Sequence, residues 1–129
     1  YTDIGTNNLK DNLIVIGGPQ VNIVQKAFND YLPVNFNKTG TKIVSKISNE
    51  EYSEPEAGFI CKIRNPFDKN KSVLVLAGIE SSGTRAAVFA FARYHERIEK
   101  GNMYNKAIIA KVVEGSEQNG EIVDVQFME

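Results

Sequence analysis

The sequence is poor in the residues that most often carry chemistry, with one cysteine, one histidine and no tryptophan among 129 residues. The single cysteine, Cys61, excludes a disulfide within the chain and a zinc site built from several thiolates. A net charge of −1 lacks the basic excess typical of nucleic-acid binding, so we expect no nucleic-acid partner. No apolar run approaches the ~18 residues of a membrane span, so we expect no membrane insertion within this segment.

A signal-peptide pattern is also missing, and the sequence begins at Tyr1 rather than at methionine. We therefore expect a segment of a longer chain or a processed product. What is present is ordinary for a globular domain, with 42% apolar and 24% charged residues. The polar, aperiodic residues 1–12 predict a linker or N-terminal arm, and residues 13–129 predict a single α/β domain.

Two apolar runs of strand length are each followed by a glycine-containing turn and by helical spacing of apolar residues. Leu13–Ile16 predicts a buried central strand, and Ser72–Gly78 is the second run. The helices are expected to begin at Gln20 and Thr84 and to end near Pro33 and Lys100. Their apolar positions are Val21, Val24, Ala27, Phe28 and Tyr31 in the first, and Ala87, Val88, Phe91, Tyr94 and Ile98 in the second.

Alternating patterns predict further strands at 41–48 and 58–64, the first with Ile43, Ser45 and Ile47 on one face. The segments "KAIIAKVVEG" and "EIVDVQFME" predict a final hairpin whose connection covers residues 115–120. The order of elements predicts an α/β layered domain with a mixed, mainly parallel central sheet, two main helices and right-handed crossovers.

Two turns, at residues 17–22 and 78–85, lie where α/β domains usually bind ligands, and helix N-termini there attract anions. A site for an anion or nucleotide would use Gly18, Asn22, Ser82, Thr84 and Arg85, while Gly17, Pro19, Gly78 and Gly83 shape the turns. The alternative is structural: glycines permit the turns, Ser82 or Thr84 caps the helix, and Asn22 joins the two loops. Neither turn matches the dinucleotide fingerprint or the P-loop.

The other candidate residues favour structural interpretations. His95 lies beside the apolar stripe near a helix end, and Cys61 is expected to be a buried, inert thiol. No nucleophile has a partner signature, so no catalytic constellation, metal site or cofactor is predicted. An acidic run lacks the spacing of an EF-hand and predicts a solvated loop; it comprises Glu50, Glu51, Glu54 and Glu56. Asn37 and Asn70 fit the glycosylation pattern, which matters if the protein is exported.

The two turns together resemble a domain of archaeal S-layer and related surface proteins. The resemblance is carried by "NLIVIGGPQVN" and by "NPF…KSVLVLAGIESSGTRAAVFAFARY", over about residues 12–94. It implies a structural role in assemblies on the cell exterior, with self-association or other surface-protein domains as partners. The slight acidic excess is a departure, because S-layer chains are often strongly acidic.

Two functions follow as hypotheses. The first is a non-enzymatic structural or assembly domain of an S-layer-like cell-surface protein. The second is a ligand-binding α/β module that recognises a phosphorylated or nucleotide-like small molecule at the two turns. Arg85 distinguishes them: in a binding module its guanidinium should point into a cleft between the turns, whereas in a scaffold it should lie on the surface or pair with a carboxylate such as Glu80.

Overall fold

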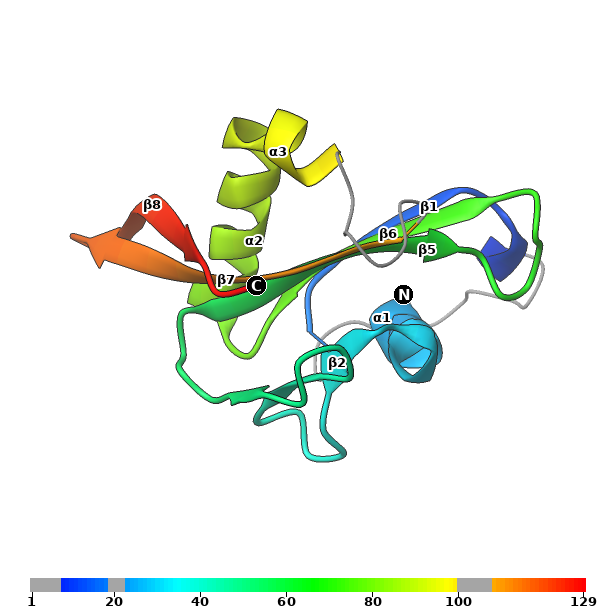
Figure 1. The fold of residues 1–129 in the computed structure, drawn as a ribbon, viewed down its shortest axis with the longest axis horizontal. Helices are drawn as coiled ribbons and strands as arrows, with labels where there is room; N and C mark the ends of the chain where they lie inside the picture. The colour runs from blue at the N-terminus through cyan, green and yellow to red at the C-terminus, as the bar shows by residue number, and fades with distance from the viewer. Residues whose placement is uncertain (1–7, 19–22, 100–107) are drawn as a thin grey trace.

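The computed structural model describes residues 8–18, 23–99 and 108–129, and its centre is a five-stranded sheet (Figure 1). The strand order is β1-β6-β5-β7-β8, with bounds Leu13–Ile16 (β1), Ala57–Arg64 (β5), Ser72–Gly78 (β6), Ile109–Gln118 (β7) and Glu121–Phe127 (β8). β1 and β6 are parallel, whereas the other neighbouring pairs in this sheet are antiparallel. The sheet is therefore mixed but not mainly parallel as predicted, because two hairpins supply four of its strands.

A second sheet of three short antiparallel strands lies on one side of the first. It consists of β2 (Val34–Phe36), β3 (Ile43–Ser45) and β4 (Glu51–Tyr52). The sequence predicted a strand around β3 alone, because β2 and β4 are too short to show a period. Ile43 and Ser45, predicted to share a face, are both buried, but Ile47 lies beyond the strand and is exposed.

The helices are shorter than the periodicity predicts. α1 (Ile23–Phe28) continues into a 3-10 turn, η2 (Asn29–Tyr31), and another 3-10 turn, η1 (Asn8–Lys10), precedes β1. α2 (Ser81–Arg93) and α3 (His95–Glu99) replace the single second helix. The predicted first helical turn, with Pro19 and Gln20, lies outside the described residues.

The buried face of α2 also differs from the predicted stripe. Its buried residues are Gly83, Ala86, Ala87 and Ala90, whereas Val88 is 37% exposed. Small side chains face the sheet because they let the helix approach it closely, and bulky apolar spacing does not reveal such a face. No helix in the described part of the chain is long and apolar enough to cross a membrane.

The large sheet separates two hydrophobic cores (Figure 1). α2 and α3 cover one face, and α1 with the small sheet covers the other. Strand β5 contributes to both, because Phe59, Cys61 and Ile63 point to the α1 side and Ile60 points to the α2 side. The predicted layered domain thus has three layers.

β1 is an edge strand, which corrects the prediction of a buried central strand. Val15 is 4% exposed, but its neighbours Ile14 and Ile16 are 70% and 51% exposed. α2 packs across β5, β6, β7 and β8, which leaves the face of β1 that carries these isoleucines accessible. A run of four apolar residues therefore marks a strand here, but not a strand covered on both faces.

The final hairpin turns more tightly than expected. Its connection is Asn119–Gly120, both with positive φ (53° and 80°), as the tight turns of hairpins require. Residues 115–118, expected in the connection, extend β7 instead.

Candidate functional site

The two predicted turns meet at a junction of glycines between α2 and the sheet. A Cβ atom on Gly83 would lie 2.1 Å from the carbonyl oxygen of Ala57, and one on Gly58 would lie 2.2 Å from that of Gly83. A Cβ atom on Gly78 would come within 2.2 Å of the Gly83 carbonyl carbon. These glycines let the main chain of the helix contact the main chains of β5 and β6 directly.

The first turn reaches the same place. Gly17 has a φ of 118°, a conformation that favours glycine, and its N–H donates to the Leu76 carbonyl at 2.9 Å. A Cβ atom on Gly18 would lie 2.9 Å from the Gly78 carbonyl oxygen. Pro19 lies outside the described residues, so its structural role stays a prediction.

A cavity of about 510 Å³ opens between the turns. It brings together three predicted site residues, Gly18, Thr84 and Arg85, and is also lined by Ile16, Gly17, Gly40, Gly78, Ile79, Glu80 and Ser81. Ser82 does not line it, because its hydroxyl donates to the Pro55 carbonyl at 3.0 Å. Asn22 lies outside the described residues, so its proposed bridge between the loops stays a prediction.

The start of α2 lacks the predicted cap. The N-cap position is Glu80, in extended backbone geometry and without a side-chain capping bond, so neither Ser82 nor Thr84 is the cap. The Thr84 N–H donates to the Glu80 carbonyl at 3.1 Å, so the helix begins at Ser81, three residues before the predicted start.

Arg85 forms an ion pair across the surface. Its Nη2 atom lies 3.3 Å from Oε1 of Glu117 on β7, and the two side chains are 50% and 33% exposed. The partner is thus a carboxylate, Glu117 rather than Glu80, but Arg85 also lines the cavity between the turns, so its position does not distinguish the two hypotheses. An exposed pair of this kind contributes at most ~1 kcal/mol to stability.

The remaining candidates lack the features of a reactive site. Cys61 is fully buried, its thiol donates to the Val34 carbonyl at 3.4 Å, and burial raises its pKa to about 12. His95 is exposed at the first residue of α3. Within residues 8–18, 23–99 and 108–129, no three histidine, cysteine or acidic side chains gather as a metal site.

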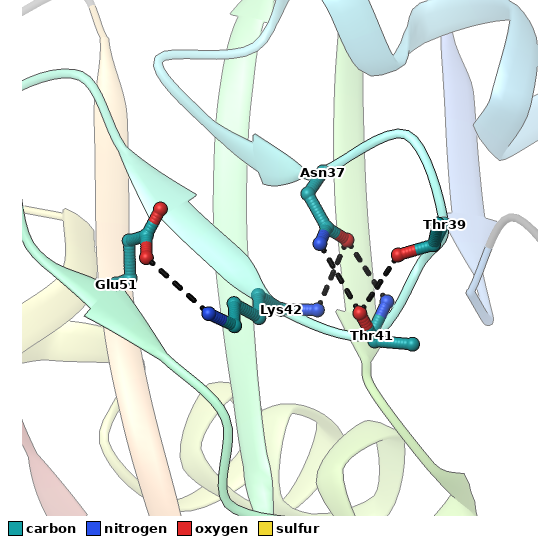
Figure 2. A network of polar contacts seen from close by, with 5 residues as sticks. All are labelled: Asn37, Thr39, Thr41, Lys42 and Glu51. Carbon is teal, nitrogen blue, oxygen red and sulfur yellow. Dashed lines mark hydrogen bonds and ion pairs between the residues drawn. The ribbon is translucent and has the colours of Figure 1, made fainter.

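The glycosylation candidates occupy different surroundings. Figure 2 shows that Asn37 organises the β2–β3 turn: its Oδ1 accepts the N–H groups of Thr41 and Lys42 at 2.9 and 3.0 Å, and its Nδ2 donates to the Thr41 hydroxyl at 3.1 Å. Lys42 in turn lies 3.6 Å from Glu51 on β4. Asn70 lies exposed in the β5–β6 turn.

A hydroxyl cluster around Glu129 was missed from the sequence. Ser45, Ser48 and Tyr52 donate to its side-chain carboxylate at 2.8, 2.5 and 2.5 Å. Burial, followed by the hydrogen bond and negative charge of Glu129, raises the pKa of Tyr52 to about 12. No local signal reveals this cluster, because Glu129 lies 77 to 84 residues along the chain from its three partners.

A second cavity, of about 630 Å³, was not predicted from the sequence either. It lies at the end of β5, and three cationic residues, Lys46, Lys62 and Arg64, are among those that line it. Its volume is within the range of small-molecule sites. Its cations come from β5 and from the turn after β3, two segments that no local sequence pattern relates.

Comparison with known proteins supports the resemblance carried by the two turns. Residues 1–95 match the model of the S-layer like family, outer domain. The chain is also 34% identical over 86 residues to the uncharacterized protein MJ0954 of Methanocaldococcus jannaschii, a match that covers 65% of this chain and 17% of that relative. No solved structure matches. Because the family model covers most of the sequence, the chain belongs to the S-layer like family, in the part described as the outer domain.

Proposed function

We propose that this chain is a non-enzymatic structural domain of a cell-surface protein, which acts in assembly through contacts with other copies or other surface domains. The observation that carries the proposal is the match of residues 1–95 to the outer domain of the S-layer like family. The matched region spans only 17% of the M. jannaschii relative, so the proposal concerns a domain within a larger surface protein.

The geometry of the turns supports this proposal. Gly58, Gly78 and Gly83 bring backbones together, and Arg85 is engaged by Glu117. Each of these residues thus has a structural role that needs no ligand. The exposed apolar side chains of Ile14, Ile16 and Val88 offer surface that further domains can cover.

The localisation is tested on intact cells that produce the parent protein. A membrane-impermeant amine-reactive label should modify this domain before lysis, and a cytoplasmic protein in the same cells should remain unlabelled. Labelling that requires lysis would contradict a surface role.

The ligand-binding alternative has its own test. A thermal-shift screen with nucleotides, sugar phosphates and simple anions should show no rise in unfolding temperature that depends on Arg85, since Ser82 points away from the cavity between the turns and Arg85 is paired. A ligand present at a hundredfold excess over its Kd would add ~2.7 kcal/mol of stability. A shift that is lost in Arg85→Ala would favour the binding module instead.

A further inference from the structure

The charged residues that line the cavity at the end of β5 are all positive. Its cations are Lys46, Lys62 and Arg64, and the other described residues that line it are neutral: Tyr31, Leu32, Pro33, Ile63, Pro66, Ser72 and Ile108. We call this the basic cavity. It combines three positive charges with apolar walls, so it suits a partner that presents carboxylates around a small apolar group.

The cations of the basic cavity have no carboxylate partner in the described part of the chain. The ion pairs found there join Lys42 to Glu51 and Arg85 to Glu117. Lys46 Nζ donates to the backbone carbonyl of Asp30 at 3.3 Å, which supplies no compensating negative charge. An anionic partner would supply the negative charge that these three residues lack within the described part of the chain.

The opposite end of β5 presents the complementary chemistry. Glu54, Pro55 and Glu56 form the loop before the strand, and Glu80 follows β6 at the same end of the sheet. We call these four residues the acidic tip. Glu54, Pro55 and Glu80 are exposed, and Glu56 is half-buried.

The acidic tip is held in place by hydrogen bonds to its backbone. The Pro55 carbonyl accepts from the Ser82 hydroxyl at 3.0 Å, and the Glu56 carbonyl accepts from the Gly115 N–H at 3.0 Å. The Ala57 N–H donates to the Glu54 carbonyl at 3.0 Å. A loop fixed in this way loses little conformational entropy on binding.

The basic cavity and the acidic tip cannot meet within one molecule. The eight residues of β5 separate them, a length of about 23 Å at the rise of an extended strand, and Figure 1 shows the two ends of β5 on opposite sides of the fold. We propose that the acidic tip of one copy docks into the basic cavity of a second copy. Glu54, Glu56 and Glu80 would face Lys46, Lys62 and Arg64, with Pro55 against the apolar walls.

Such a contact is heterologous, because two different surfaces of the same chain meet. Each bound copy leaves one acidic tip and one basic cavity free, so further copies add head to tail into an open row unless the rotation closes a ring. This inference rests on the proposed function in so far as it names a second copy as the partner, and it specifies which surfaces carry the assembly.

The association is measured by sedimentation velocity of the 129-residue chain at low ionic strength, at concentrations up to about 1 mM. The wild-type chain should form concentration-dependent oligomers that dissociate when the salt is raised from about 50 mM to about 500 mM, because screening shortens the reach of the charges. The double variant Lys62→Glu/Arg64→Glu should associate at least about tenfold more weakly.

A charge-swap mixture identifies the occupant. The variant Glu54→Lys/Glu56→Lys should also lose association by itself. Mixing it with Lys62→Glu/Arg64→Glu places opposite charges across every contact again, so oligomers with alternating copies should return. The matched control Lys38→Glu/Lys69→Glu makes the same change in net charge at exposed positions that do not line the basic cavity, and it should associate nearly as the wild type does.

Three results would overturn the proposal: a wild-type chain that stays monomeric, a cavity variant that associates as before, or a mixture that fails to restore association. The last would assign the basic cavity to a different anionic partner. Circular dichroism and thermal midpoints establish that each variant is folded before it is compared. Failure here leaves the surface role intact, because that role is tested by labelling of intact cells.

Discussion

At the scale of single residues, the Glu129 carboxylate with its three hydroxyl donors connects segments 77 to 84 residues apart through hydrogen bonds. It joins the end of the chain to β3, β4 and the turn between them. Met128 donates its N–H to the Val112 carbonyl at 2.7 Å, which holds the preceding residue against β7. Charge-assisted hydrogen bonds of this kind are stronger than neutral ones.

We predict that Glu129→Gln destabilises the protein by about 1–2 kcal/mol, because the amide accepts fewer and weaker hydrogen bonds than the carboxylate. Urea denaturation measures the change as a lower midpoint at unchanged slope. The variant Glu121→Gln changes the same charge at an exposed position and serves as the control. Equal stability of the two variants would show that the hydroxyl cluster contributes nothing.

The same cluster predicts a dependence of stability on alkaline pH. The pKa of Tyr52 rises from 10.0 to about 12 on folding, so the folded state holds its proton more tightly than the unfolded state does. The stabilisation is complete below pH 10 and disappears as the pH rises towards 12. Cys61 and Tyr94 have raised pKa values as well and contribute to the same loss.

We therefore expect Tyr52→Phe to reduce, but not abolish, the loss of stability between pH 10 and 12. The measurement is a series of urea midpoints across that range for the wild type and the variant. Identical slopes against pH would exclude Tyr52 as a source of the dependence.

At the scale of elements, the sequence predicted where most helices and strands lie, but it predicted less well which of their faces are buried. It identified β1, β5, β6 and the final hairpin from apolar runs and turn residues. It placed β1 in the centre of the sheet, because Leu13–Ile16 reads the same whether a strand is covered on both faces or lies at an edge. Of the predicted stripe, Ala87 and Ile98 are buried and Phe91 and Tyr94 pack against the same core. Gly83, Ala86 and Ala90 were missed, because they carry too little side chain to give a hydrophobic period.

The glycine junction predicts a large effect from a small substitution. Gly83→Ala should cost about 3 kcal/mol or more, because the new Cβ atom meets the rigid carbonyl of Ala57 at 2.1 Å and α2 must move away. Gly120→Ala is the control, since nothing lies within 4 Å of its Cβ position and only its positive φ of 80° opposes the change. That variant should lose about 1 kcal/mol.

Thermal or urea unfolding of both variants gives the comparison. If Gly83→Ala is no less stable than Gly120→Ala, the helix and strand do not contact each other as closely as described.

At the scale of the whole molecule, one sheet serves two cores. Strands β5, β6 and β7 place side chains in both hydrophobic clusters, so neither core can lose its packing without disturbing the strands that support the other. The candidate sites also belong to this scale. The sequence foresaw that the two turns would lie together, but the basic cavity and the Glu129 cluster join segments whose proximity depends on the arrangement of both sheets.

We predict a single cooperative unfolding transition. Far-UV circular dichroism and tyrosine fluorescence should give the same urea midpoint, since Tyr52 reports on the small sheet and Tyr94 on the α2 side. Because the chain has five tyrosines, the difference between the wild-type signal and that of Tyr52→Phe or Tyr94→Phe isolates the contribution of each residue. Two distinct midpoints would show that the faces of the sheet unfold independently.

The glycine junction has a further consequence, for how freely this domain can change its sequence. Gly83 contacts Gly78 and Ala57 through main-chain atoms. The position of α2 on the sheet therefore depends on the absence of side chains at a few residues, and less on side chains of complementary shape. Exposed positions of α2, such as Val88, can therefore be replaced without moving the helix. A domain whose helix is held by main-chain contacts can acquire new side chains on its surface while its fold remains the same.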